Sequence, residues 1–158
     1  MATEYEGKFK ADDMRFCIVV AQFNRFITDP LLKSALSTIE ENGGNTDNVD
    51  VVWVPGAFEI PLACKQVIGP KPYRYDAIIA LGAVIRGGTP HFDYVCDAVT
   101  RGITDTMLQS GMPIAFGILT TDTVDQAVDR TNNKVGDKGR EATVAAIQMI
   151  DLLRQVKG

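Results

Sequence analysis

The chain has 158 residues, of which 46% are hydrophobic and 23% are charged. This length is typical of one domain, because domains commonly have about 100–200 residues. We expect one domain over residues 1–158, with an N-terminal arm over residues 1–13. Sixteen Lys and Arg against 20 Asp and Glu give a net charge of -4, which excludes a general cationic surface for nucleic acid or anionic lipid.

Location and redox state follow from the apolar stretches and the cysteines. No stretch approaches the ~20 consecutive apolar residues of a transmembrane helix, and residues 1–13 lack the apolar core of a signal peptide. Cys17, Cys64 and Cys96 are odd in number and widely spaced, which favours buried thiols over disulfides or a zinc site. We therefore expect a cytoplasmic protein with no membrane partner.

The first half of the chain predicts two strands and two helices. A buried-strand pattern covers residues 15–22, and Asp29 and Pro30 then supply the N-cap and first-turn proline of a helix. A second strand pattern covers residues 49–54. The short helix after it has Pro61 in its first turn, where a proline is tolerated.

The second half repeats this alternation of strand and helix. A strand over residues 76–85 precedes a helix with an apolar stripe from 92 to 107, and a fourth strand covers residues 114–121. A short helix over 124–130 and a long one over 141–156 complete the pattern. We expect the inward face of the last helix to consist of Ala142, Ala146, Met149, Leu153 and Val156.

Strands that are apolar throughout and alternate with helices indicate a parallel sheet covered on both faces. The predicted fold class is therefore α/β, a three-layer α/β/α arrangement around a central, mainly parallel sheet. Ligands of such sheets bind beyond the carboxyl ends of the strands. Four segments hold these places: 23–24, 56–59, 86–91 and 120–122.

His91 is the only histidine, and it lies where the loop after the third strand enters a helix. Both proton transfer and a structural role at the helix terminus are open at this point. A zinc site lacks ligands, because there is neither a second His nor a Cys cluster. Acyl-enzyme chemistry lacks a nucleophile, because Ser34, Ser37 and Ser110 lie within or at the ends of helices and not in a Gly-x-Ser-x-Gly turn.

Two glycines in the segment 86–89 allow backbone N–H groups to converge before a helix N-terminus. This pattern fits an anion cradle and a tight turn equally well. Gly88 stands where a nucleotide phosphate-binding loop needs Lys, and no Gly-x-Gly-x-x-Gly follows the first strand. Nucleoside triphosphate hydrolysis and dinucleotide binding are therefore disfavoured.

Aromatic and basic residues suggest what the strand ends bind. Phe23 and Phe58 lie beside Asn24 and Glu59, which fits a planar heterocycle held between aromatic and polar groups, although core packing is an equal alternative. Arg130 opens a basic loop that is either solvated or binds phosphate, and its guanidinium can hold two oxygens at once.

Five segments form a combination of motifs in a fixed order along the chain: Phe23-Asn24, Val54-Pro55-Gly56-Ala57-Phe58-Glu59-Ile60-Pro61, Gly82-Ala83-Val84-Ile85-Arg86-Gly87-Gly88-Thr89-Pro90-His91-Phe92-Asp93-Tyr94, Phe116-Gly117-Ile118-Leu119-Thr120-Thr121 and Lys134-Val135-Gly136-Asp137-Lys138-Gly139. This combination resembles the 6,7-dimethyl-8-ribityllumazine synthase family of riboflavin biosynthesis. The resemblance runs from about Tyr5 to the end of the chain and implies a flavodoxin-like fold. The chain departs from the family pattern at 131–133, where the family has small residues around a glycine, and at Asp137, where it has Asn.

The resemblance implies a transferase that condenses 5-amino-6-(D-ribitylamino)uracil with 3,4-dihydroxy-2-butanone 4-phosphate, without a metal or organic cofactor. His91 becomes the general acid/base of this reaction. The pyrimidine is expected to stack on Phe23, and Lys138 is expected near the site. The other implied substrate contacts are Ala57, Phe58 and Glu59 for the ribityl chain, the backbone of Ala83, Val84 and Ile85 for the pyrimidine, and Gly88, Thr89 and Arg130 for the phosphate.

The resemblance also implies a homopentamer in which Phe116 reaches the pyrimidine of the adjacent subunit. Residues 5–9 are then expected to add a strand to a neighbour's sheet, and pentamers stay single, pair, or close into an icosahedral capsid of about 60 subunits. Two other interpretations remain at this stage. One is a flavodoxin-like module that binds flavin or lumazine passively, and the other is a structural shell protein.

Overall fold

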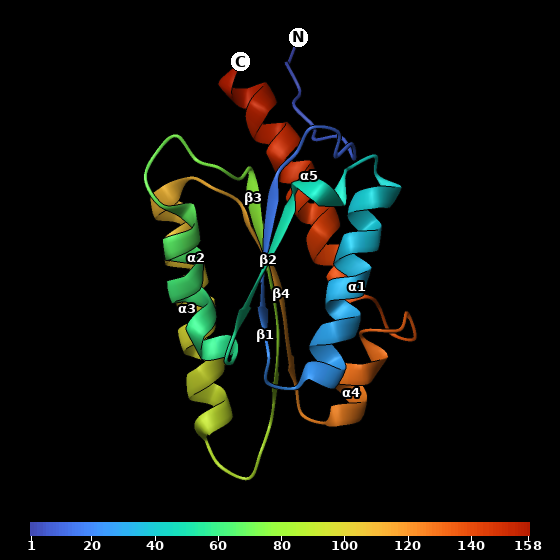
Figure 1. Cartoon of the computed structure of the whole chain (residues 1–158), viewed down its shortest axis with the longest axis vertical. Helices are drawn as coiled ribbons and strands as arrows, with labels where there is room; N and C mark the ends of the chain where they lie inside the picture. Colours follow the sequence, from blue (N-terminus) through green and yellow to red (C-terminus); the bar gives the residue numbers. More distant parts are fainter.

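A computed structural model describes all 158 residues and contains one parallel sheet of four strands (Figure 1). The strands are β1 (Phe16–Ala21), β2 (Val49–Val54), β3 (Ala77–Ile85) and β4 (Ile114–Thr121). Their order across the sheet is β2-β1-β3-β4, and every neighbouring pair is parallel. The strands β2 and β4 therefore form the two edges.

Helices cover both faces of the sheet. One face carries α2 (Ile60–Ile68) and α3 (His91–Ser110), and the other carries α1 (Arg25–Glu41), α4 (Val124–Asp129) and α5 (Lys138–Lys157) (Figure 1). Two short 3-10 turns, η1 (Thr46–Asn48) and η2 (Ala57–Glu59), precede β2 and α2. The expected three-layer, flavodoxin-like α/β/α class is confirmed.

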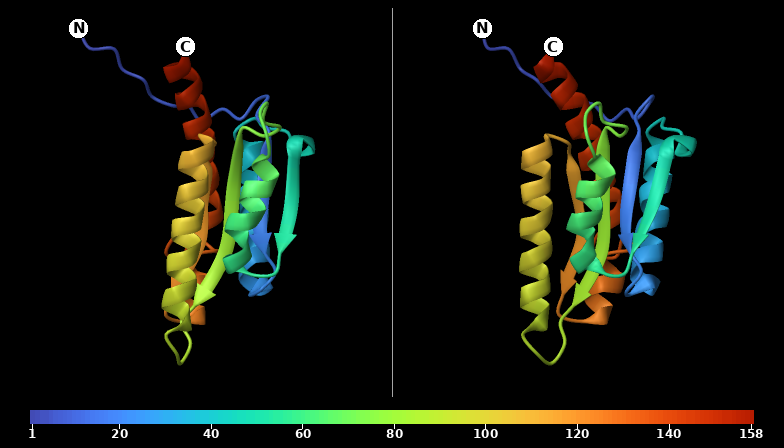
Figure 2. Two further views of the ribbon diagram at one scale, coloured as in Figure 1. Left: turned by 90° about the vertical axis from the view of Figure 1, so that its left-hand side faces the viewer. Right: turned by 60° about the vertical axis from the view of Figure 1, so that its left-hand side comes forward.

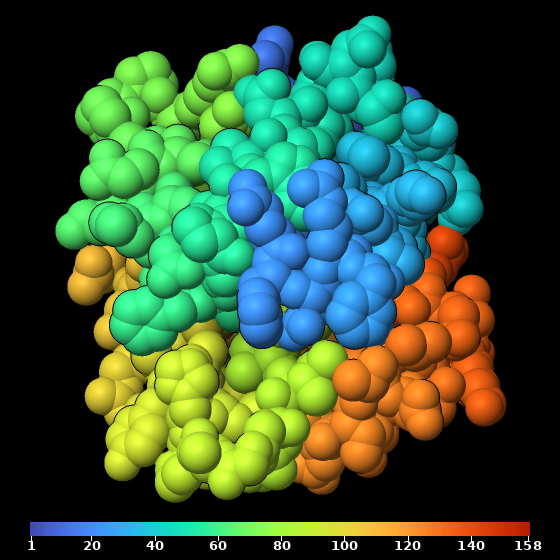
Figure 3. Space-filling view, turned by 60° about the horizontal axis from the view of Figure 1, so that its bottom comes forward, coloured from blue at the N-terminus to red at the C-terminus, as the bar shows by residue number.

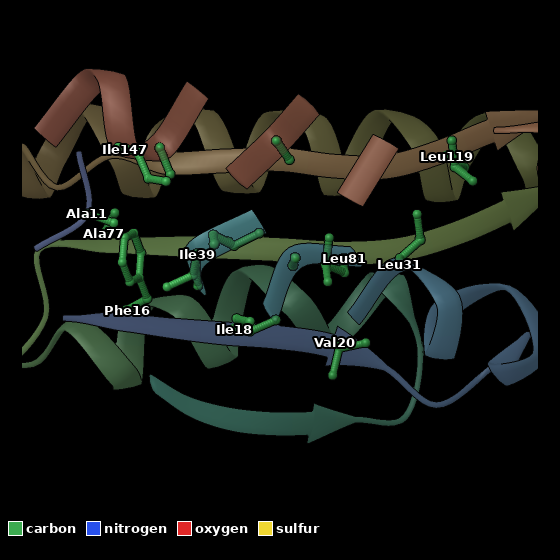
Figure 4. Close-up of a cluster of buried hydrophobic side chains, with 14 of the residues drawn as sticks. Ala11, Phe16, Ile18, Val20, Leu31, Ile39, Ala77, Leu81, Leu119 and Ile147 are labelled. Carbon is green, nitrogen blue, oxygen red and sulfur yellow. The ribbon is translucent and has the colours of Figure 1, made fainter. Parts of the chain in front are cut away.

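Alternate side chains of each strand point to opposite faces, which gives the sheet two separate cores. Phe16, Ile18 and Val20 of β1 pack towards α1 and α5 (Figure 4). Cys17 and Val19 pack towards α2 and α3. All three cysteines are free; Cys17 and Cys64 are buried as expected, and Cys96 is half-buried.

The expected start of the first helix is wrong, because α1 begins at Arg25 and holds Pro30 inside it. Asn24 adopts a left-handed conformation with φ of 61°, which turns the chain directly from β1 into the helix. The Thr28 hydroxyl donates to the carbonyl of Ala21 at 2.8 Å and fixes this tight connection. The helix therefore starts before the proline, and the lost Pro30 N–H leaves only one carbonyl, that of Phe26, without its helical donor.

The last helix also differs from the expectation. It begins at Lys138, because the carboxylate of Asp137 accepts from the Arg140 backbone N–H at 3.2 Å and caps it. Its buried face contains Ala142 and Ala146 as expected, together with Thr143, Ile147 and Ile150. The expectation that Met149 and Val156 face inward is wrong, because both are exposed. The stripe of α5 that packs on the sheet runs through Thr143, Ile147 and Ile150 instead.

Residues 1–10 form no helix or strand, and the chain start extends away from the body of the molecule (Figure 2). The arm is held on α5 where the Lys8 backbone N–H donates to Asp151 at 2.9 Å and Gln155 donates to the carbonyl of Glu6 at 2.8 Å. The expected pairing of residues 5–9 with a neighbouring sheet stays a prediction. No helix is long and apolar enough to span a bilayer.

Candidate active site

The carboxyl ends of the parallel strands meet at one end of the molecule, where the segments after β1, β2, β3 and β4 lie side by side (Figure 3). A cavity of about 580 Å³ opens here, which we call the first cavity. Most of the expected site residues line the first cavity. These residues are Phe23, Ala57, Phe58, Glu59, Ala83, Val84, Ile85, Thr89 and His91.

Backbone and side-chain hydrogen bonds hold the walls of the first cavity together. The Phe23 N–H donates to the Pro55 carbonyl at 3.0 Å, which joins the segments after β1 and β2. The Asn24 side-chain amide donates to the Ala83 carbonyl at 3.1 Å, which joins the segment after β1 to β3. The cavity floor is therefore built from three strands that are adjacent in the sheet.

Two phenyl rings stand exposed at this cavity: Phe23 is 70% and Phe58 is 61% exposed. Neither ring packs in the core, so the alternative of core packing is wrong for both Phe23 and Phe58. Large exposed aromatic rings beside a cavity are suited to stacking against a planar ligand.

His91 is the first residue of α3 and is exposed at the cavity. Its backbone N–H donates to the hydroxyl of Thr89 at 3.4 Å, and its imidazole has no hydrogen-bond partner within the chain. An imidazole in this place is free to exchange protons with a bound molecule. Gly88 lies in the same loop but does not line the cavity, whereas Gly87 does.

A second cavity of about 260 Å³ lies along the carboxyl-terminal half of β4 and is lined by the remaining charged candidates. Arg130, Lys138 and Glu141 line it, and it is mainly polar. The Arg130 guanidinium donates to the Gln126 carbonyl at 2.8 Å, and the Lys138 N–H donates to the Arg130 carbonyl at 2.9 Å. These bonds fix the loop between α4 and α5 so that two cations face one small space.

Phe116 lies elsewhere, in a third, apolar cavity of about 410 Å³ along the edge of β4. This cavity lies between α3 and α5, and Leu108 and Met149 are among its walls. No residue lines both the first cavity and either of the other two. Within one copy of the chain, His91 therefore lies at a different cavity from Arg130, Lys138 and Phe116.

Comparison with known proteins shows the family of the chain. A model of the family described as 6,7-dimethyl-8-ribityllumazine synthase matches residues 13–154. The chain belongs to this family. Two proteins named 6,7-dimethyl-8-ribityllumazine synthase, from two strains of Clostridium kluyveri, are each 47% identical to it over 153 residues, which cover 97% of this chain and 98% of theirs.

Membership of the lumazine synthase family confirms the expected transferase activity in riboflavin biosynthesis. The passive flavin-binding module and the purely structural shell are set aside accordingly. No three His, Cys, Asp or Glu side chains of the chain come together as a group that could hold a metal ion.

Sequence reasoning missed one residue that lines the first cavity and one ion pair at the carboxyl end of the sheet. Tyr94 lines the first cavity and is 75% exposed, and its position three residues after His91 places both side chains on one face of α3. That spacing was available as a signal. Asp122 was noted only as part of the segment after β4, and nothing local in the sequence reveals that it pairs with Arg86.

Proposed function

We propose that lumazine forms at a site made by two copies of the chain. One copy supplies the first cavity with His91, and its neighbour supplies Phe116, Arg130 and Lys138. The observation that carries this proposal is the separation of these residues into cavities that share no lining residue within one chain. A reaction between two substrates needs all of these groups around one space.

The exposed edge of β4 supports a neighbour at this place. An unpaired strand edge is normally covered or paired, and large apolar patches on a surface are typical of interfaces. The cavity beside this edge is lined mainly by apolar residues, and Leu108 and Met149 are 73% and 40% exposed there.

The two halves of the proposed site lie on different surfaces of the chain, so contact between copies is head-to-tail. Head-to-tail contacts close into rings when the rotation permits. We propose the homopentamer that the family resemblance implies. Light scattering on the purified protein distinguishes single rings from paired rings and from a capsid of about 60 subunits.

In the first cavity, the pyrimidine stacks on Phe23 and meets the backbone of residues 83–85. Ala57, Phe58 and Glu59 hold the ribityl chain. The exposed ring of Phe23 and the carboxyl-end position of residues 83–85 support these assignments. Glu59 is half-buried and supplies acceptor oxygens for hydroxyl groups.

The phosphate is held by Gly88, Thr89 and Arg130, with Lys138 beside them. Gly88 and Thr89 lie just before α3, where the helix dipole favours negative charge. Arg130 and Lys138 face one polar cavity in the neighbouring copy and add two positive charges. A chain with net charge -4 has no general field for this purpose, so these placed cations matter.

The chemistry fits a site with one imidazole and no enzyme nucleophile. The substrate amine attacks the ketone carbon, water leaves and an imine forms. Phosphate is then expelled and the ring closes with loss of water, while His91 takes up and returns protons. An imidazole can both accept and donate a proton, so one histidine serves both directions of this transfer.

The proposed function is tested by mixing the purified protein with both substrates and following lumazine absorbance together with phosphate release. Equal rates of the two signals are expected, and omission of either substrate should abolish both. Absence of lumazine formation above the rate of the two substrates without protein would refute the proposal.

We also propose one domain with an N-terminal arm, located in the cytoplasm. The three free cysteines support this location, because thiols persist in reducing compartments. Cell fractionation with an antibody against the chain tests it, and recovery of the protein in an oxidising compartment would contradict it.

A further inference from the structure

Arg86 follows β3 directly and lines neither the first nor the second cavity. Its Nε donates to Oδ1 of Asp122 at 2.8 Å, and its Nη1 lies 3.6 Å from Oδ1 of Asp93. The guanidinium carbon also lies 4.4 Å from the centre of the Phe92 ring. One side chain thus contacts an ionic partner on either side and an aromatic face.

These partners belong to two different segments at the carboxyl end of the sheet. Asp122 follows β4, whereas Phe92 and Asp93 belong to the first turn of α3, directly after His91. The Arg86 backbone N–H donates to the Thr121 carbonyl at 2.8 Å and extends the contact between β3 and β4. Arg86 therefore links the end of β4 to the turn of helix that carries His91.

The loop between Arg86 and His91 has little packing of its own. No atom outside the chain neighbours lies within 4 Å of the Cβ position of Gly87 or Gly88. The residues of this loop are exposed. The hydrogen bond to Asp122 also raises the pKa of the Arg86 guanidinium, so that the charge of this link persists.

We propose that Arg86 is a positioning residue for the condensation, and that its pairs with Asp122 and Asp93 hold the loop 87–90 and His91 in the reactive geometry. This inference rests on the role proposed for His91. The Arg86 guanidinium pairs with two carboxylates and lines neither the first nor the second cavity, so we assign it no contact with substrate. An exposed ion pair contributes little to folding stability, whereas a displacement of about 1 Å at reacting groups lowers the rate strongly.

The test compares Arg86→Ala, Asp122→Asn and the double variant with wild type in steady-state kinetics. Each single change should lower kcat by about 10-fold with little change in the KM of either substrate. The double variant should be no slower than the slower single variant, because both changes remove the same link. Asp122→Asn keeps the backbone contact of residue 122 with Gln126 and carries the test if Arg86→Ala does not fold.

Arg101→Ala is the matched control. Arg101 lies on α3 like His91, pairs with Asp97 at 3.2 Å and is exposed, but lines none of the three cavities. Its kcat should equal that of wild type, and an equal loss in Arg101→Ala would overturn the inference.

Two further outcomes overturn it. One is a raised KM for the phosphorylated substrate in Arg86→Ala alone, which would make Arg86 a phosphate ligand. The other is unchanged kcat in all Arg86 and Asp122 variants of an active enzyme. A wild-type protein that forms no lumazine refutes the proposed function instead, so the two failures are distinguishable.

Discussion

Arg130→Ala should weaken the phosphorylated substrate much more than the pyrimidine. The guanidinium uses one nitrogen to donate to the Gln126 carbonyl at 2.8 Å, and its other donors are left to face the second cavity. Loss of a charge-assisted hydrogen bond of roughly 1.5–3 kcal/mol corresponds to about 10- to 150-fold weaker binding. We expect the lower part of this range, because Lys138 remains in the same cavity.

The measurement is the KM of each substrate, together with competitive inhibition by inorganic phosphate. Lys134→Ala is the matched control, since Lys134 lies on the same loop and is exposed, but pairs only with Asp129 and lines none of the three cavities. The KM of each substrate and the inhibition constant of phosphate should be the same in Lys134→Ala as in wild type. An equal loss of affinity for both substrates in Arg130→Ala would refute the reasoning, since Arg130 would then support the loop and not the phosphate.

Three other changes give distinct outcomes. His91→Ala should lower kcat by about 10²-fold with smaller effects on KM, and full turnover across neutral pH would remove its role. Gly139→Ala should lower the free energy of unfolding in urea by about 1–3 kcal/mol, because the added Cβ would overlap the Leu31 carbonyl oxygen of α1. Unchanged stability would contradict this packing. Burial raises the pKa of Cys17 and of Cys64 to about 12 each. The free energy of unfolding should therefore be highest below the thiol pKa of the unfolded chain, near 8.5, and fall by roughly 1.4 kcal/mol per pH unit for each thiol as the pH rises towards 12. A free energy of unfolding in urea that stays constant from pH 8 to about 11 would contradict this prediction.

The sheet was predictable because its strands are short, apolar and bounded by polar or glycine-rich turns. The bounds expected for β2 and β4 match the structure, and those for β1 and β3 differ only at their ends. The start of α1 was not predictable, because Pro30 is a strong local signal for a helix start. The deciding feature is the left-handed turn at Asn24, which depends on contacts with β3 and the end of β1.

The first cavity was predictable in the same way, since the carboxyl ends of adjacent parallel strands must meet. His91 and Phe23 were therefore singled out by their positions directly after predicted strands, and the family resemblance implied their roles. The sequence did not reveal that Arg130 and His91 lie at different cavities of one chain. This separation depends on the order of the strands, which places β4 at the edge of the sheet. The pair between Arg86 and Asp122 was equally hidden, since its partners lie 36 residues apart and meet only when β3 pairs with β4.

Co-assembly of two impaired variants tests the shared site most directly. His91→Ala and Arg130→Ala are co-expressed with different tags, mixed rings are purified, and lumazine formation is measured with the phosphorylated substrate below its KM for Arg130→Ala. If His91 comes from one copy and Arg130 from the next, about a quarter of the sites in an evenly mixed ring hold both intact residues. The account predicts recovery to about that fraction of wild-type activity, compared with roughly a tenth for Arg130→Ala alone and roughly a hundredth for His91→Ala alone. Mixed rings no more active than the average of the two variants would contradict it, because both residues would then act within one copy.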